Sequence, residues 1–180
     1  NGVTVIMRYT LRLLTAQQFE RASALICACE FLRNKYSIAG CEISIGLWVG
    51  MDLTPNTLLS AKENIERIKE GETVHRGNPM QIFHCPFCGK DFDIGDYKIE
   101  KTLKIKCPNA DCFFYNGLPV YLIDEDIYNK RPTLILSTID KFARIVWEEK
   151  TVAIFGSDGN TEPPELIIQD ELHLISGPLG

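Results

Sequence analysis

The segment ELIIQDELHLISGPLG, residues 165–180, joins an apolar run to a group of acidic and turn-forming residues. The run from Leu166 to Ile168 is typical of a strand that is buried on both faces of a parallel sheet. Asp170 and Glu171 follow it, and His173 lies two residues further on. Carboxylates at the tip of a strand can hold magnesium and orient water, whereas the plainer alternative is a surface turn. The fold around the segment decides between them.

Short apolar strands alternate with helices along most of the chain. Strands are expected at residues 3–7, 43–49, 119–123, 133–136 and 165–169. Helices are expected at about residues 15–33, from Thr54 to Ile68, and after Ser137 or Thr138. This alternation predicts an α/β fold in which a mainly parallel sheet carries helices on both faces.

The two longer helices have separate sequence signals. The first has apolar residues at spacings of three and four, a pattern that turns one helix face to the core. These residues are Phe19, Ala22, Leu25, Ile26, Cys29 and Leu32. For the second helix, Thr54 is expected to cap the N-terminus and Pro55 to occupy the first helical position.

The composition is that of an ordinary globular protein, with 180 residues, 45% of them hydrophobic and 24% charged. No apolar run is long enough to cross a membrane and the N-terminus has no signal-peptide pattern, so we expect a cytoplasmic protein without a membrane partner. The chain begins on a β-like run without an initiator Met, as expected of part of a longer protein. The net charge of −5 argues against binding nucleic acid through bulk positive charge, but it allows a narrow basic cleft.

The seven cysteines form two groups. Three lie among apolar residues and are expected to be reduced core residues, namely Cys27, Cys29 and Cys41. The other four form the pairs Cys85-x2-Cys88 and Cys107-x4-Cys112. Two thiolate pairs on separate turns can converge on one zinc ion, and a complete set of four ligands leaves no position for a catalytic water. We therefore predict a structural zinc site, with a redox CxxC pair as the alternative.

The composition also changes around these cysteines. We expect a zinc-ribbon insertion at residues 83–116, which divides the α/β domain into residues 1–82 and 117–180. Gly89 permits the tight turn of the first knuckle, and Pro108 stiffens the second. His84 is expected to be a bystander to the metal. No histidine stands in the H-x-E pattern that zinc deaminases require, which excludes that chemistry.

One segment of the insertion is rich in lysine. Read as a single strand, it places alternate residues on one face, namely Lys98, Glu100, Thr102, Lys104 and Lys106. Such a face can contact phosphates. A solvated face that protects a sheet edge from pairing is the favoured interpretation.

A phosphate-binding loop is missing from the sequence. The pattern G-x-x-x-x-G-K-[ST] does not occur, and the only Gly-Lys pair is Gly89-Lys90, which Asp91 follows. Either the acidic pair has another role, or the loop lies upstream of Asn1.

Three segments together resemble the motor domain of superfamily 2 helicases of the DExH type. Asp170-Glu171-Leu172-His173 resembles the Walker B motif, residues 3–18 (VTVIMRYTLRLLTAQQ) resemble motif Ia, and residues 134–147 (LILSTIDKFARIVW) resemble motif Ib. With the four-cysteine insertion, the chain is most similar to the helicase-like component of the DISARM anti-phage system. The resemblance implies a RecA-like sheet.

The resemblance also implies roles for individual residues. Asp170 would hold magnesium with ATP, Glu171 would activate the attacking water, and His173 would couple the nucleotide site to the nucleic-acid cleft. The residues that would face a phosphate backbone are Arg8, Thr10, Arg12, Ser137, Thr138 and Lys141. Hydroxyls, cations and helix N-termini hold phosphates without reading sequence. Thr10 and Ser137 are alternatively helix caps, and Arg12 is alternatively a solvated residue.

The implied function is that of an ATP-dependent nucleic-acid helicase or translocase in anti-phage defence. Its cofactors would be ATP, Mg²⁺ and Zn²⁺, and its partners a nucleic acid, with DNA the first choice, and other defence subunits. The phosphate loop and the second motor domain are missing, so little ATPase is expected from these 180 residues alone. The alternative is a zinc-ribbon module on an α/β scaffold that binds nucleic acid or protein without ATP.

Overall fold

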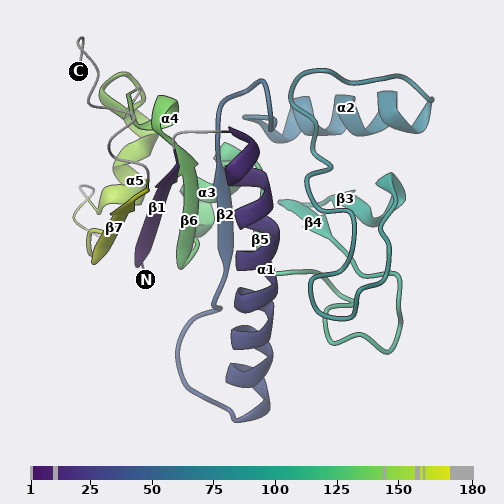
Figure 1. Cartoon of the computed structure of the whole chain (residues 1–180), viewed down its shortest axis with the longest axis horizontal. Helices are drawn as coiled ribbons and strands as arrows, with labels where there is room; N and C mark the ends of the chain where they lie inside the picture. Colours follow the sequence, from purple (N-terminus) through teal and green to yellow (C-terminus); the bar gives the residue numbers. More distant parts are fainter. Residues whose placement is uncertain (1, 10–11, 144, 157–158, 160, 171–180) are drawn as a thin grey trace.

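The fold is a five-stranded parallel sheet with helices on both faces, as the sequence predicts (Figure 1). The computed structural model describes residues 2–9, 12–143, 145–156, 159 and 161–170. The sheet has the order β5-β2-β6-β1-β7. Its strands are β1 (Val5–Tyr9), β2 (Ile45–Trp48), β5 (Val120–Tyr121), β6 (Leu134–Thr138) and β7 (Leu166–Gln169).

Five α-helices occur within the described residues. They are α1 (Arg12–Lys35), α2 (Leu58–Lys69), α3 (Asp124–Lys130), α4 (Ile139–Ala143) and α5 (Val152–Phe155). Three short 3-10 turns are η1 (Ile94–Asp96), η2 (Ile145–Trp147) and η3 (Glu149–Thr151). Within the described residues, no helix has both the length and the apolar character that a membrane span requires.

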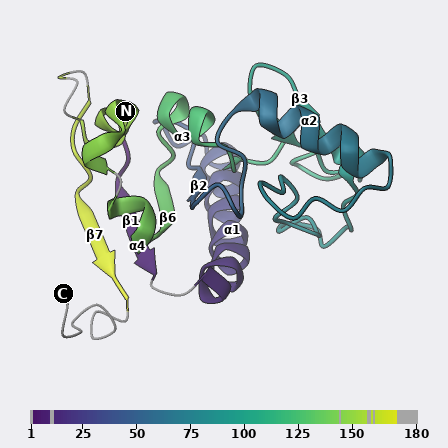
Figure 2. The same cartoon turned by 90° about the horizontal axis from the view of Figure 1, so that it is seen from above.

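Two hydrophobic cores lie on opposite faces of the sheet. Successive residues of a strand point to opposite faces, and on β6 Ile135 joins one core while Leu136 joins the other. The core with Leu136 packs against α1 and α2, and the core with Ile135 packs against α3 and α5. In both views the hairpin β3 (Tyr97–Ile99) and β4 (Leu103–Ile105) lies with α2 at the end of the molecule opposite β7 (Figure 2).

Several predicted boundaries are wrong for local reasons. The N-cap of α2 is Thr57, which accepts a hydrogen bond from Ser60 N, so the helix starts later than the Thr54-Pro55 signal indicates. The lysine-rich segment forms a hairpin instead of one strand, and Thr102 at its turn is buried. The expected cap residues Ser137 and Thr138 belong to β6 itself.

The buried face of α1 also differs from the predicted apolar face. Leu25 and Leu32 are exposed, whereas the polar residues Ser23 and Glu30 are buried. Phe19 and Ile26 are buried as predicted. The spacing rule finds the helix, but it misses a face that includes a buried carboxylate. Among the expected core cysteines, Cys27 is buried while Cys41 is exposed.

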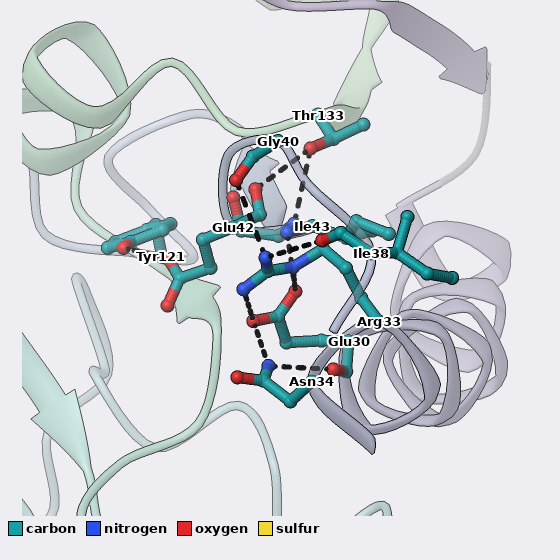
Figure 3. Close-up of polar contacts among 10 residues, drawn as sticks. Glu30, Arg33, Asn34, Ile38, Gly40, Glu42, Ile43, Tyr121 and Thr133 are labelled. Carbon is teal, nitrogen blue, oxygen red and sulfur yellow. Dashed lines mark hydrogen bonds and ion pairs between the residues drawn. The ribbon is translucent and has the colours of Figure 1, made fainter. Parts of the chain in front are cut away.

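Glu30 organises the connection between α1 and β2 (Figure 3). Its carboxylate accepts hydrogen bonds from Arg33 Nε and Nη2 at 2.7 Å and from Asn34 Nδ2 at 2.7 Å. It also accepts one from the backbone N–H of Ile43 at 2.8 Å. Although burial works in the opposite direction, these hydrogen bonds lower the pKa of Glu30. The carboxylate therefore fixes the chain just before β2.

We expect Glu30→Ala to lower the free energy of unfolding by about 1–2 kcal/mol at pH 7, because the partly buried guanidinium of Arg33 and the partly buried N–H of Ile43 lose their acceptor. Since the pKa of Glu30 is lowered in the fold, its contribution is complete above the unfolded pKa of about 4.3 and disappears as the pH falls through the folded value. Urea unfolding at pH 7 and at pH 3 measures both effects. Glu63→Ala, on an exposed side chain of α2, is the control and should change little. Equal losses for the two variants would contradict the role of Glu30.

The cysteine-rich segment shares one core with the sheet. Its buried residues Tyr97, Leu103, Ile105 and Phe114 belong to the same cluster as Leu47 of β2. Asp126 of α3 adds a polar link, since its Oδ2 accepts a hydrogen bond from Leu103 N at 2.9 Å. The division of the chain at residues 83–116 stays a prediction, but its two sides are joined by buried contacts.

Asp126 gives this link a pH dependence. Burial raises the pKa of Asp126 to about 6, although the bond from Leu103 N–H works in the opposite direction. The stability that Asp126 contributes is therefore complete below the unfolded pKa of about 3.9 and disappears as the pH rises through about 6. Asp126→Asn keeps an oxygen acceptor without this titration. We expect it to raise the free energy of unfolding at pH 7 by about 2 kcal/mol and to flatten the profile between pH 4 and 6.

Thermal unfolding from pH 4 to pH 8 tests this expectation, with the exposed Asp111→Asn as the control. A variant at Asp126 that is less stable than the wild type at pH 7 would show that the charged carboxylate is needed.

Candidate metal centre and the carboxyl edge of the sheet

The four predicted zinc ligands converge. The sulfur atoms of Cys85, Cys88, Cys107 and Cys112 all lie within 4.8 Å of one another. Cys85 Sγ is 3.8 Å from Cys112 Sγ, and Cys88 Sγ is 3.5 Å from Cys107 Sγ. Sulfurs placed tetrahedrally at about 2.3 Å from a zinc ion lie about 3.8 Å apart. The donor set and its spacing therefore fit one zinc ion, and the sulfurs are too far apart for disulfides.

Backbone geometry supports both knuckles. Gly89 has φ +76°, a conformation that glycine adopts readily, and its N–H donates to Cys85 O at 2.9 Å. Backbone N–H groups of Lys90, Asn109 and Phe114 donate to the sulfurs of Cys88, Cys107 and Cys112 respectively. Such bonds stabilise thiolates, which are the metal-binding form.

The cluster needs a cation to hold all its thiolates. Although burial opposes the change, hydrogen bonds from Lys90 N–H and the other thiols lower the pKa of Cys88 to about 7. Burial raises the pKa of Cys112 to about 11 and that of Cys107 further. One thiolate at neutral pH therefore disfavours the deprotonation of the neighbouring cysteines. A zinc ion would remove this conflict, and four protein ligands would leave it no open position, as in a structural site.

His84 is outside the metal cluster, as predicted. Its ring nitrogens lie 3.3 Å from Asp91 Oδ1 and 3.7 Å from Glu20 Oε1. Cys27 of α1 is buried nearby, and burial together with the charges of Cys85 and Cys112 raises its pKa to about 12. Neither side chain belongs to the group of converging ligands.

Aromatic rings surround the knuckles and reach the surface. The ring of Phe31 on α1 lies 5.0 Å from that of Phe87 and 5.3 Å from that of Phe113, measured between centroids. Phe87 and Phe113 are 38% and 45% exposed. Lys35 Nζ lies 5.9 Å from the Phe31 centroid. We call these four residues the aromatic surface; such exposed rings are typical of interfaces.

The strands that carry the three helicase-like motifs are neighbours. β1 lies between β6 and β7, with Arg8 opposite both Ser137 and Gln169. Because all three strands are parallel, their carboxyl ends meet at one edge of the sheet, which we call the carboxyl edge. Ligands of open α/β sheets bind outside such edges.

Arg8 and Asp170 lie together at this edge. Arg8 Nε donates to Gln169 Oε1 at 2.6 Å, and Asp170 N donates to Arg8 O at 3.0 Å. The guanidinium of Arg8 lies 4.6 Å from the ring centroid of Phe142. Burial, followed by the charge of Asp170, raises the pKa of Tyr9. Asp170 is therefore a carboxylate at the tip of β7, close to the end of β1.

The motif Ib residues are mostly interior. Ser137 and Thr138 are buried, and Ser137 Oγ donates to Thr138 O at 3.1 Å. Lys141 is also buried, and its ammonium bonds Asp124 Oδ2 of α3. The structure thus brings these three residues to the carboxyl edge but gives Lys141 an internal partner. Their contact with nucleic acid stays a prediction.

The remaining residues that were predicted to act on ATP or nucleic acid lie partly or wholly outside the described residues. Thr10, Glu171 and His173 lie outside the described residues. Arg12 begins α1, and only its backbone is described. The described part has the carboxylate of Asp170 at the tip of β7, and its role as a magnesium ligand stays a prediction. Since the sequence has no phosphate loop, the described residues do not form a complete ATP site.

β7 is less covered than its sequence predicts. Leu166, Ile167 and Ile168 are 50%, 48% and 37% exposed, so the expected burial on both faces is wrong for the described part of the chain. Within that part β7 pairs with β1 alone. Among the described residues, no strand pairs with its outer edge.

A comparison with curated proteins shows one close similarity. The chain is 43% identical over 224 aligned positions to DISARM protein DrmA of Bacillus paralicheniformis (strain ATCC 9945a / NCIMB 11709 / CD-2), and the alignment covers 99% of the chain. The chain is related to DISARM protein DrmA. It spans 20% of the length of that DrmA, so the activity of a whole DrmA-like protein is a matter for proposal. No protein-family model matches the chain.

Two residues of this DrmA-related chain form buried ion pairs that the sequence did not predict. Asp124 and Glu30 are buried carboxylates that hold Lys141 and Arg33 respectively. The run Asp124-Glu125-Asp126 carries a signal, because acidic residues favour the first turn of a helix. For Glu30 the spacing to Arg33 (i, i+3) indicates an ion pair on the helix, but its burial depends on the contact with Ile43 N, which the sequence does not indicate.

Proposed function

We propose that the chain is part of an ATP-driven nucleic-acid translocase or helicase that acts in anti-phage defence. The observation that carries the proposal is the adjacency of β6, β1 and β7, whose carboxyl ends bear the motif Ib, motif Ia and Walker B segments. These segments are far apart in sequence, yet they share one edge. The relationship to DISARM protein DrmA supports the defence context.

In this proposal Asp170 holds Mg²⁺ with ATP, Glu171 orients the attacking water and His173 couples the nucleotide to the nucleic acid. Asp170 has the required place at the tip of β7. The remainder of a DrmA-like protein would supply the phosphate loop. In the described part of the chain β7 pairs with β1 alone, so a further strand could add to its outer edge and bring that loop beside Asp170.

The nucleic acid, with DNA the first choice, would run along the carboxyl edge near Arg8, Thr10, Arg12, Ser137 and Thr138. Hydroxyls and cations there would contact phosphates and leave the bases unread, as a motor requires. The zinc ion would hold the two knuckles together. Other defence subunits are further candidate partners.

A second candidate is a binding module that acts without ATP. The aromatic surface beside the zinc knuckles favours it, because exposed rings of this kind mark interfaces with proteins and stacking sites for unpaired bases.

Hydrogen-exchange footprinting of the full-length protein with single-stranded DNA separates the two candidates. The motor proposal expects protection of the segments that follow β1 and β6, increased by a non-hydrolysable ATP analogue. Protection confined to the aromatic surface and indifferent to nucleotide would favour the binding module.

A further inference from the structure

Lys141 lies in the motif Ib segment but points away from solvent. It is 9% exposed, and its ammonium bonds Asp124 Oδ2 of α3. The same ammonium lies 5.8 Å from the centroid of the Trp48 ring, at the end of β2. A cation held between a buried carboxylate and an aromatic ring has most of its charge satisfied inside the protein.

A small, partly open pocket lies beside this pair. The cavity has a volume of about 60 Å³, and Trp48, Asp124, Tyr128 and Lys141 are among its lining residues. Trp48 Nε1 donates to Tyr128 Oη at 3.2 Å. The pair is therefore set in a polar network that joins β2, α3 and α4.

The outward side of Lys141 is unfavourable for phosphate. It borders an open cavity of about 460 Å³, whose lining residues include Asp52 and Asp140. Asp52 is paired with Arg76 at 2.8 Å, and the ammonium of Lys141 is paired with Asp124. A cation that already has a carboxylate partner attracts a phosphate less than an unpaired one would.

The ion pair is instead linked to Arg8 through aromatic contacts. Lys141 and Phe142 are neighbours on α4, and the Phe142 ring lies 5.6 Å from that of Trp48. Phe142 supports the guanidinium of Arg8 at 4.6 Å, and Arg8 bonds Gln169 beside Asp170. A shift of α4 would therefore move the aromatic support of Arg8.

We propose that Asp124 and Lys141 are positioning residues: their buried ion pair holds α4 so that Phe142 places Arg8 at the carboxyl edge, and Lys141 itself makes no phosphate contact. This inference rests on the proposed nucleic-acid binding of that edge. Motif resemblance gives Lys141 a contact with phosphate, and the inference replaces this contact with a positioning role. It also assigns a positioning role to Asp124, which the resemblance does not cover.

The test measures binding of single-stranded DNA by the full-length protein as a function of salt. Asp124→Asn releases the ammonium but keeps the side-chain shape, and the proposal expects binding about tenfold weaker with an unchanged slope of log K against log salt. If Lys141 were a phosphate ligand restrained by Asp124, the same variant would bind more tightly and its slope would steepen, which would overturn the proposal.

The double variant Asp124→Asn with Lys141→Met removes the charges together, so that no unpaired buried charge remains. The proposal again expects weaker binding with the wild-type slope. Wild-type affinity would show that the pair is only structural, and a slope reduced by about 0.7 would identify Lys141 as a phosphate ligand; either result overturns the proposal. Lys62→Met, on the exposed surface of α2, is the control and should match the wild type.

Absence of DNA binding by the wild type would instead count against the proposed function, and the positioning role would fall with it. Normal wild-type binding with unaffected variants would overturn the positioning role alone.

Discussion

Replacing Cys107 by Ser should remove the bound zinc and unfold the sheet together with the cysteine-rich segment. Cys107 is buried and belongs to the same hydrophobic cluster as Leu47 and Leu136 of the sheet. Structural zinc contributes about 10–16 kcal/mol of apparent binding free energy in zinc-finger peptides, which exceeds the stability of most domains. We therefore expect one cooperative loss of structure instead of a local loss that spares the α/β core.

Elemental analysis and near-UV circular dichroism of the purified protein measure the two effects. The wild type should contain about one zinc per chain, and Cys107→Ser should contain none and lose its near-UV signal. Cys41→Ser changes an exposed thiol away from the cluster and should keep both. A wild-type protein that is metal-free yet fully folded would contradict the zinc site.

Glu171→Gln should lower ATP turnover by the full-length protein about 100-fold or more, as expected when a positioned base is lost. ATP binding should persist, because the proposed magnesium ligand Asp170 is unchanged. The expectation rests on the motif resemblance together with the place of Asp170 at the tip of β7. The 180-residue chain alone should hydrolyse little ATP with or without the substitution.

The matched control is Glu165→Gln at the opposite end of β7, which removes a similar charge from an exposed side chain. It should leave turnover near the wild-type rate. Unchanged turnover in Glu171→Gln would remove that residue from catalysis and favour a degenerate motor domain that serves as a scaffold.

The parallel sheet and the metal centre were predictable because their signals are local. Short β-branched and apolar runs such as Leu134–Leu136 that alternate with helices indicate strands of a parallel sheet, and two close cysteine pairs indicate a shared metal. The strand order is a tertiary property, and it emerged only when the structure placed β1 between β6 and β7.

The sequence did not predict that several charged residues are buried, and the reason is physical. Glu30, Asp124 and Lys141 are charged residues, which are exposed by default. Asp124 and Lys141 are buried because each satisfies the charge of the other across two helices. Glu30 is buried with Arg33 and Asn34 of its own helix and the backbone N–H of Ile43 as donors. Motif resemblance likewise takes no account of the buried partner of Lys141, which comes from α3. The strand β7 shows the opposite error, because its apolar residues were expected to be buried but are exposed. An apolar run is buried only where a neighbouring element covers it.

In the proposed motor, the carboxyl edge couples ATP hydrolysis to nucleic acid. The most direct test of this coupling is the rate of ATP hydrolysis by the full-length protein with and without single-stranded DNA. We expect DNA to stimulate the rate severalfold and Asp170→Asn to abolish the stimulation. DNA binding accompanied by no ATP turnover under either condition would contradict the coupling.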